Sequence, residues 1–173
     1  EGRIFDLGGM KVEAIAVPGH TDGSMVFYLH GKDLLFTGDA IGSGHGVWIF
    51  NADGYHKYAS AIPHLISWIN NPENGVNVNK LRIYGGHYWQ RDWLPELEGK
   101  ELGMSYINEM QELINQIKAG TASKKPSGLV SGWFLRLIRR TAQRTHSPQS
   151  SSANTGHRNC SSWHHTACIA LSY

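Results

Sequence analysis

Three short segments of the sequence place a candidate metal ligand directly after a glycine. They are Pro18-Gly19-His20, Thr37-Gly38-Asp39 and Gly85-Gly86-His87. Each follows a run of apolar and β-favouring residues, so each ligand is predicted to stand at the end of a strand. Imidazole and carboxylate groups together suit Zn²⁺, with iron or manganese as alternatives. We therefore expect His20, Asp39 and His87 to meet around metal ions, although they lie far apart in the sequence.

Each of these motifs, taken alone, is better explained without a metal. The chain contains ten histidines, and a single Gly-His after a strand is usually only a turn. A Gly-Asp at a strand end is more often a turn or a helix cap than a ligand. The three motifs together, in this order, favour metal binding.

The stretch Pro18-Gly19-His20-Thr21-Asp22-Gly23-Ser24, followed by Leu34-Leu35-Phe36-Thr37-Gly38-Asp39-Ala40, resembles the second half of metallo-β-lactamase-fold hydrolases. Gly85-Gly86-His87 resembles their last ligand motif. The resemblance covers residues 1–118 and implies half of an αββα sandwich, in which a mixed sheet with flanking helices carries the metals at one edge.

The same resemblance implies a role for each ligand. His20 is expected to bind the first of two zinc ions, His87 the second, and Asp39 to bridge both as the catalytic carboxylate. A hydroxide between the metals is then expected to attack the substrate, since metal coordination lowers the pKa of water to about 7. Thr21 and Ser24 are expected to support the ligands through hydrogen bonds.

The chain departs from the family in one respect. The His-x-His-x-Asp-His motif, which comes from the first half of the fold, is absent from the sequence. We therefore expect a truncated chain whose parent enzyme carries the other ligands upstream, and a fragment that is inactive alone. The missing N-terminal half is the expected structural partner, because half of a sandwich exposes an apolar sheet face.

The pattern along the chain predicts the elements that position these ligands. Alternating and β-rich runs predict strands over 3–7, 11–17, 24–30, 33–37, 47–50 and 81–84, with turns at Gly8-Gly9 and Gly31-Lys32. Apolar residues at helical spacing predict helices over 55–69 and 95–118. Strands with helices at their ends indicate the α/β class.

Residues 119–173 differ in character from the predicted domain, 1–118. Residues 1–112 hold all 14 Asp and Glu and 8 of the 16 Lys and Arg, whereas 113–173 hold the other 8 basic residues and no acid. This basic tail is predicted to be disordered or non-native, as after a frameshift. The alternative function is a non-catalytic interaction module, with a basic amphipathic helix over 129–145 that docks on a membrane or a partner. Nucleic acid and membrane are not the favoured partners.

The glycine-rich segment after Asp39 offers candidates for a substrate pocket. His45, Trp48 and Tyr55 are predicted to line it, although Trp48 fits the core equally well and His45 fits an exposed loop. The resemblance leaves the small-molecule substrate open among esters, thioesters, lactones and lactams.

Compartment also stays open between cytoplasm and periplasm. The sequence shows neither a signal peptide nor an apolar run of the roughly 20 residues that span a bilayer. Its only cysteines, Cys160 and Cys168, lie in the tail, so no disulfide is expected within 1–118.

Overall fold

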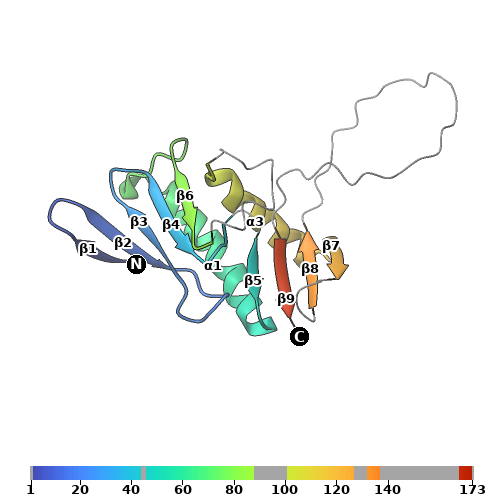
Figure 1. Cartoon of the computed structure of the whole chain (residues 1–173). Helices are drawn as coiled ribbons and strands as arrows, with labels where there is room; N and C mark the ends of the chain where they lie inside the picture. Colours follow the sequence, from blue (N-terminus) through green and yellow to red (C-terminus); the bar gives the residue numbers. More distant parts are fainter. Residues whose placement is uncertain (1, 44–45, 88–100, 127–131, 137–167, 173) are drawn as a thin grey trace, which may run out of the picture.

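The computed structural model describes residues 2–43, 46–87, 101–126, 132–136 and 168–172 of the chain. Its main feature is a mixed five-stranded sheet in the order β1-β2-β3-β4-β6. The first four strands pair antiparallel, and β6 joins parallel to β4 (Figure 1). The bounds of these strands are β1 Arg3–Asp6, β2 Lys11–Ala16, β3 Met25–Leu29, β4 Leu34–Gly38 and β6 Arg82–Gly85.

Helix α1, Ala52–Asn70, lies between β4 and β6 in the chain and supplies the crossover that a parallel pair of strands requires. The Asn51 side chain caps its first turn by accepting a hydrogen bond from the Gly54 N–H at 2.7 Å. A short 3₁₀ turn, η1 Pro72–Asn74, follows α1. A second long helix, α3 Met104–Lys118, packs beside α1.

The two faces of the five-stranded sheet differ in cover. Val26, Leu35 and Ile83 are buried in one apolar core with the inner residues of both helices. On the opposite face Phe27 is 41% exposed and Phe36 is 43% exposed, and the Phe36 ring stacks on Tyr84 with 5.7 Å between ring centres. The predicted α/β architecture is confirmed: within the described residues, helices cover one face of the sheet and exposed aromatic side chains lie on the other.

Most of the predicted elements agree with the structure to within three residues at each end. The helix predicted over 95–118 is an exception, because its described part begins only at Met104. Leu102 instead makes an antiparallel bridge to Ile83, whose N–H donates to the Leu102 carbonyl at 2.8 Å. Gly103 then occupies the N-cap position. The bridge uses the backbone groups of this segment in sheet pairing, which excludes a helix there; residues 88–100 lie outside the described part.

A second sheet of four short strands, in the order β5-β9-β8-β7, stands beside the first (Figure 1). Its strands are β5 Val47–Ile49, β9 Cys168–Ser172, β8 Gly132–Arg136 and β7 Ser123–Pro126. The basic helix predicted over 129–145 is wrong for residues 132–136, which form a strand paired on both sides. The run Trp133-Phe134-Leu135 is rich in β-favouring residues, and ladders on both sides satisfy its backbone.

Three segments of the tail predicted to be disordered therefore carry strands in the structure: 123–126, 132–136 and 168–172. Residues 127–131 and 137–167 lie outside the described part. Among the described residues, no helix combines the length and apolar character that crossing a membrane requires.

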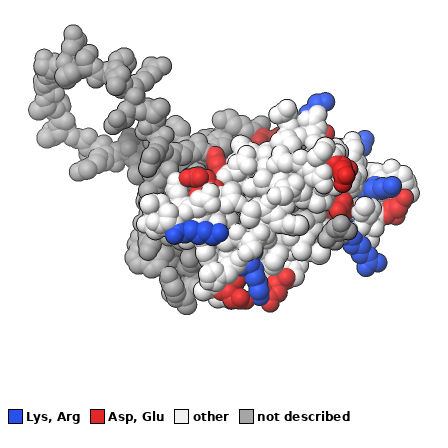
Figure 2. Space-filling model, turned by 180° about the vertical axis from the view of Figure 1, so that it is seen from behind, with Lys and Arg blue, Asp and Glu red and all other residues white. Residues whose placement is uncertain are grey.

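Charged side chains of both signs are interspersed over the described residues of the face shown in Figure 2. One ion-pair network joins the turn after β2 to helix α1. The Lys57 amino group lies 2.7 Å from Asp22 Oδ1 and 2.6 Å from Asp53 Oδ2. These two hydrogen bonds raise the pKa of Lys57 above its usual value, so the amino group stays charged and holds the turn against the helix.

Candidate metal centre at the strand ends

His20 stands in a tight turn between β2 and β3. The turn is closed by backbone hydrogen bonds, from Val17 N to Ser24 O at 2.9 Å and from Gly19 N to Thr21 O at 3.1 Å. The Ser24 hydroxyl also accepts from the Thr21 N–H at 3.0 Å and lies 2.9 Å from the Thr21 hydroxyl. Thr21 and Ser24 thus hold the backbone of the turn that carries the imidazole.

Asp39 and His87 are brought together by the parallel pairing of β4 with β6. Asp39 follows Gly38, the last residue of β4, which has the left-handed φ of 50°. His87 follows Gly86, whose N–H donates to the Gly38 carbonyl at 3.0 Å. A Cβ on Gly86 would lie 2.9 Å from Asp39 Oδ1, so glycine at this position leaves room for the carboxylate.

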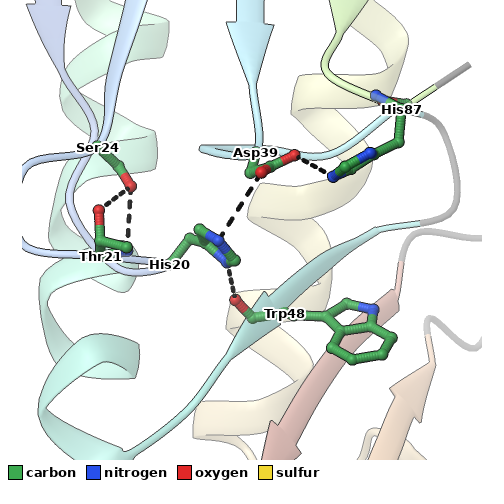
Figure 3. A network of polar contacts seen from close by, with 7 residues as sticks. His20, Thr21, Ser24, Asp39, Trp48 and His87 are labelled. Carbon is green, nitrogen blue, oxygen red and sulfur yellow. Dashed lines mark hydrogen bonds and ion pairs between the residues drawn. The ribbon is translucent and has the colours of Figure 1, made fainter. Parts of the chain in front are cut away.

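The structure places the imidazoles of His20 and His87 beside the carboxylate of Asp39 (Figure 3). His87 Nε2 lies 2.9 Å from Asp39 Oδ1, and His20 Nε2 lies 4.0 Å from Asp39 Oδ2. Each imidazole therefore approaches a different oxygen of Asp39. The side chains of Asp39 and His87 are 44% and 43% exposed, and that of His20 is 22% exposed, so the three groups open to solvent.

The orientation of His20 is set by the backbone of β5. His20 Nδ1 lies 2.8 Å from the carbonyl oxygen of Trp48. A carbonyl only accepts hydrogen bonds, so Nδ1 is the donor in this contact and Nε2 is the ring nitrogen that faces Asp39. Nε2 is therefore the nitrogen of His20 that is placed to bind a cation together with Asp39 Oδ2, 4.0 Å away. Histidines that bind metals commonly donate their second N–H to a backbone carbonyl in this way.

The donor set fits divalent cations. Two atoms that bind one tetrahedral zinc ion lie about 3.3–3.6 Å apart, because Zn–N and Zn–O bonds are about 2.0–2.2 Å long. The two contacts of Asp39 lie on either side of that separation: 2.9 Å to His87 and 4.0 Å to His20. The side chains form a chain, from one imidazole through the carboxylate to the other, rather than a closed group. Accordingly, no group of three or more His, Cys, Asp or Glu within the described residues is already placed to hold a metal ion.

A cavity of about 160 Å³ opens beside these side chains. Trp48 and Val47 are among the residues that line it, so strand β5 borders the candidate site. Tyr55 is not among its described lining residues. The Tyr55 hydroxyl is buried without a hydrogen-bond partner in the described part of the chain, and burial raises its pKa above the usual 10.0. His45 lies outside the described residues.

Two residues that sequence reasoning did not select support the loop between Asp39 and β5. Ser43 is 2% exposed, and its hydroxyl accepts a hydrogen bond from the His87 N–H at 3.0 Å. The buried Tyr106 hydroxyl donates to the Ile41 carbonyl at 2.8 Å and accepts from the Gly46 N–H at 3.1 Å. These contacts join segments 44 to 65 positions apart, so no local motif in the sequence indicates them.

Replacing Tyr106 by phenylalanine is expected to destabilise the chain by about 1–3 kcal/mol, because two backbone groups inside the protein lose their partner. Urea unfolding followed by circular dichroism measures the change. Ser60→Ala is the control, since the exposed Ser60 hydroxyl donates to the His56 carbonyl of its own helix. Equal unfolding midpoints for Y106F and the parent chain would show that the hydroxyl does not anchor the loop.

Comparison with known proteins gives three findings. The family model described as the metallo-beta-lactamase superfamily matches residues 1–65. The atrochrysone carboxyl ACP thioesterase dmxR1 of Cryptosporiopsis sp. (strain 8999) is 33% identical over 124 residues, which cover 69% of this chain and 34% of that protein. The lactamase-like protein nscB of Trichophyton equinum is 35% identical over 83 residues, 46% of this chain and 24% of that protein.

Among solved structures, a metallo-beta-lactamase from Pontibacter korlensis is 19% identical with a TM-score of 0.45, and the match covers 66% of this chain and 46% of that one. The chain spans about a third or less of the length of the curated relatives it matches.

Proposed function

The chain resembles the metallo-β-lactamase superfamily, and from this premise we propose that it forms part of the active site of a metal-dependent hydrolase. The observation that carries the proposal is the convergence of two imidazoles on the two oxygens of Asp39. Two zinc ions, when bound, would supply Lewis acidity and activate water for attack on a carbonyl carbon.

Each candidate ligand has its own proposed role at the metal centre. Asp39 has one carboxylate oxygen beside each imidazole, so it suits a position between two cations. There its negative charge would offset part of their positive charge. His20 is held in the tautomer that leaves Nε2 available, by the Trp48 carbonyl. His87 approaches from β6 on the other side. Trp48 and Val47 on β5 line the cavity, which leaves room beside Asp39 for the acyl part of a substrate.

Among the esters, thioesters, lactones and lactams that the resemblance allows, we propose that the substrate is an acyl thioester. Relatives from Cryptosporiopsis sp., Claviceps purpurea and Aspergillus fumigatus carry the name atrochrysone carboxyl ACP thioesterase. One of them is similar over 69% of this chain, which supports the same class of bond for this protein. The acyl group itself is left open by the site.

The proposal is tested by hydrolysis of an acyl N-acetylcysteamine thioester, followed by release of the thiol. We expect the 173-residue chain alone to give no rate above buffer, because the ligands of the first half of the fold are absent. Joined behind the first half of the Cryptosporiopsis relative, it should hydrolyse the thioester in the presence of Zn²⁺. The matching oxygen ester and a β-lactam serve as alternative substrates.

Two outcomes of this assay separate the parts of the proposal. A folded, zinc-loaded protein that cleaves only the lactam or the oxygen ester would contradict the thioester assignment but leave the metal centre in place. A folded protein whose rate does not depend on Zn²⁺, with D39N as active as the parent, would contradict the metal-dependent hydrolase itself.

A further inference from the structure

The buried hydroxyl of Ser43 contacts the backbone of a candidate ligand. Ser43 is 2% exposed, and its Oγ accepts the His87 N–H at 3.0 Å. His87 carries the side chain that lies 2.9 Å from Asp39 Oδ1. The hydrogen bond therefore ties the loop that follows Asp39 to the residue that meets Asp39 from β6.

The fit between Ser43 and β6 depends on a missing side chain. A Cβ on Gly85 would occupy the position of the Ser43 hydroxyl. Gly85 is the last residue of β6, and Gly86 after it leaves room for the Asp39 carboxylate. Two consecutive glycines thus admit two polar groups: the first admits the Ser43 hydroxyl, and the second admits the Asp39 carboxylate. Close approach of a backbone to a functional group is a principal reason for glycine at such positions.

The segment that carries Ser43 also leads to the group that orients the imidazole of His20. The same segment continues through Gly46 into β5, where the Trp48 carbonyl accepts from His20 Nδ1 at 2.8 Å. The Tyr106 hydroxyl holds the segment from helix α3 through Ile41 and Gly46. One loop segment therefore reaches both histidines, through a backbone carbonyl for His20 and through a side-chain hydroxyl for His87.

We propose that Ser43 is a positioning residue, which fixes the backbone of His87 so that its imidazole meets Asp39. The inference rests on the proposed metal centre and adds a residue to it. The described hydrogen bond of the Ser43 hydroxyl is to the backbone of His87, through which we propose that it acts on the site. Groups that orient a metal ligand typically change metal affinity by about 10- to 100-fold when removed.

The test uses the 173-residue chain with serine replaced by alanine at position 43. We expect S43A to bind Zn²⁺ about tenfold more weakly, measured by competition with a chromophoric chelator. Ser43→Cys keeps a side chain of similar size with a weaker hydrogen-bond acceptor. The Zn²⁺ affinity of this variant should fall between those of S43A and the parent chain. Ser67→Ala is the matched control, because the Ser67 hydroxyl bonds to the Pro63 carbonyl within α1. Ile62→Val controls for a loss of stability in the core, away from the site.

Amide hydrogen exchange supplies a readout that does not depend on metal. In the metal-free chain, S43A should speed exchange of the His87 amide at least about fivefold, the effect of losing one hydrogen bond. The Gly86 amide bonds to the Gly38 carbonyl and serves as the internal reference. Its exchange rate should not change, because that bond does not involve Ser43.

The outcomes distinguish this inference from the proposed function. Equal Zn²⁺ affinity of S43A and the parent, with D39N impaired, would overturn the role of Ser43 and leave the metal centre standing. Equal acceleration of the His87 and Gly86 amides would also overturn it, since the hydroxyl would then be a general structural support. If D39N binds Zn²⁺ as well as the parent does, the metal centre fails, and the positioning role fails with it.

Discussion

Replacing Asp39 by asparagine is expected to lower the affinity of the chain for Zn²⁺ by at least about 100-fold, more than is usual for groups that only orient a ligand. The substitution keeps the size of the side chain but removes the negative charge and one of the two acceptor oxygens. Both oxygens face an imidazole in the structure, so both are needed if Asp39 bridges two cations. Isothermal titration of the metal-free chain with Zn²⁺ measures the effect.

The matched control for D39N is Asp33→Asn, which removes a carboxylate at the opposite end of β4. The Asp33 side chain accepts from the Tyr28 hydroxyl at 3.2 Å and from the Asn77 N–H at 2.8 Å. We expect D33N to bind Zn²⁺ as the parent does. The assignment of Asp39 would be contradicted if both variants bound the metal equally well.

Replacing Gly19 by alanine is expected to destabilise the chain by about 2–4 kcal/mol. Gly19 has a φ of +149°, which side chains rarely adopt, and its Cβ would lie 2.6 Å from the Cβ of Tyr58. Tyr58 is completely buried in helix α1, so it has no room to retreat. The turn that carries His20 therefore packs directly against helix α1 at Tyr58. Chemical unfolding of G19A against the parent chain gives the change in free energy.

Gly23 offers a control within the same turn. Its φ is not in the left-handed region, and a Cβ there would meet nothing within 4 Å. Gly23→Ala is therefore expected to leave the free energy of unfolding within about 0.5 kcal/mol of the parent, as for an ordinary surface substitution. Equal losses for G19A and G23A would show that contact with Tyr58 does not restrain the His20 turn.

The strand ends that carry the candidate ligands were predictable because each has a local signal. Apolar alternation marks the strands, and a glycine before each ligand marks the turn. The pairing of β4 with β6 has no such local signal, since helix α1 separates the two strands in sequence. The pairing arises because the crossover through α1 returns the chain to the same sheet. The structure then shows Asp39 and His87 side by side at the ends of these two strands.

The features that the sequence did not predict depend on contacts between distant segments. The sequence predicts Trp48 as a pocket or a core residue, whereas in the structure its backbone carbonyl orients His20. Leu102 continues an apolar pattern of helical period, but its backbone pairs with Ile83, and the helix begins only at Met104. The apolar residues at 132–136 fit neither a helical nor a strand period clearly, and pairing with β7 and β9 makes this segment a strand. Local preference is overridden in each case by a backbone partner far away in the chain.

The central claim is that His20, Asp39 and His87 share bound metal. It is tested most directly by anomalous diffraction at the zinc edge from crystals of the chain grown with Zn²⁺. We expect density within about 2.0–2.2 Å of an Asp39 carboxylate oxygen and of Nε2 of His20 or His87. Zinc found only at other histidines, such as His56 or His64, with His20 and His87 unchanged around Asp39, would contradict the account.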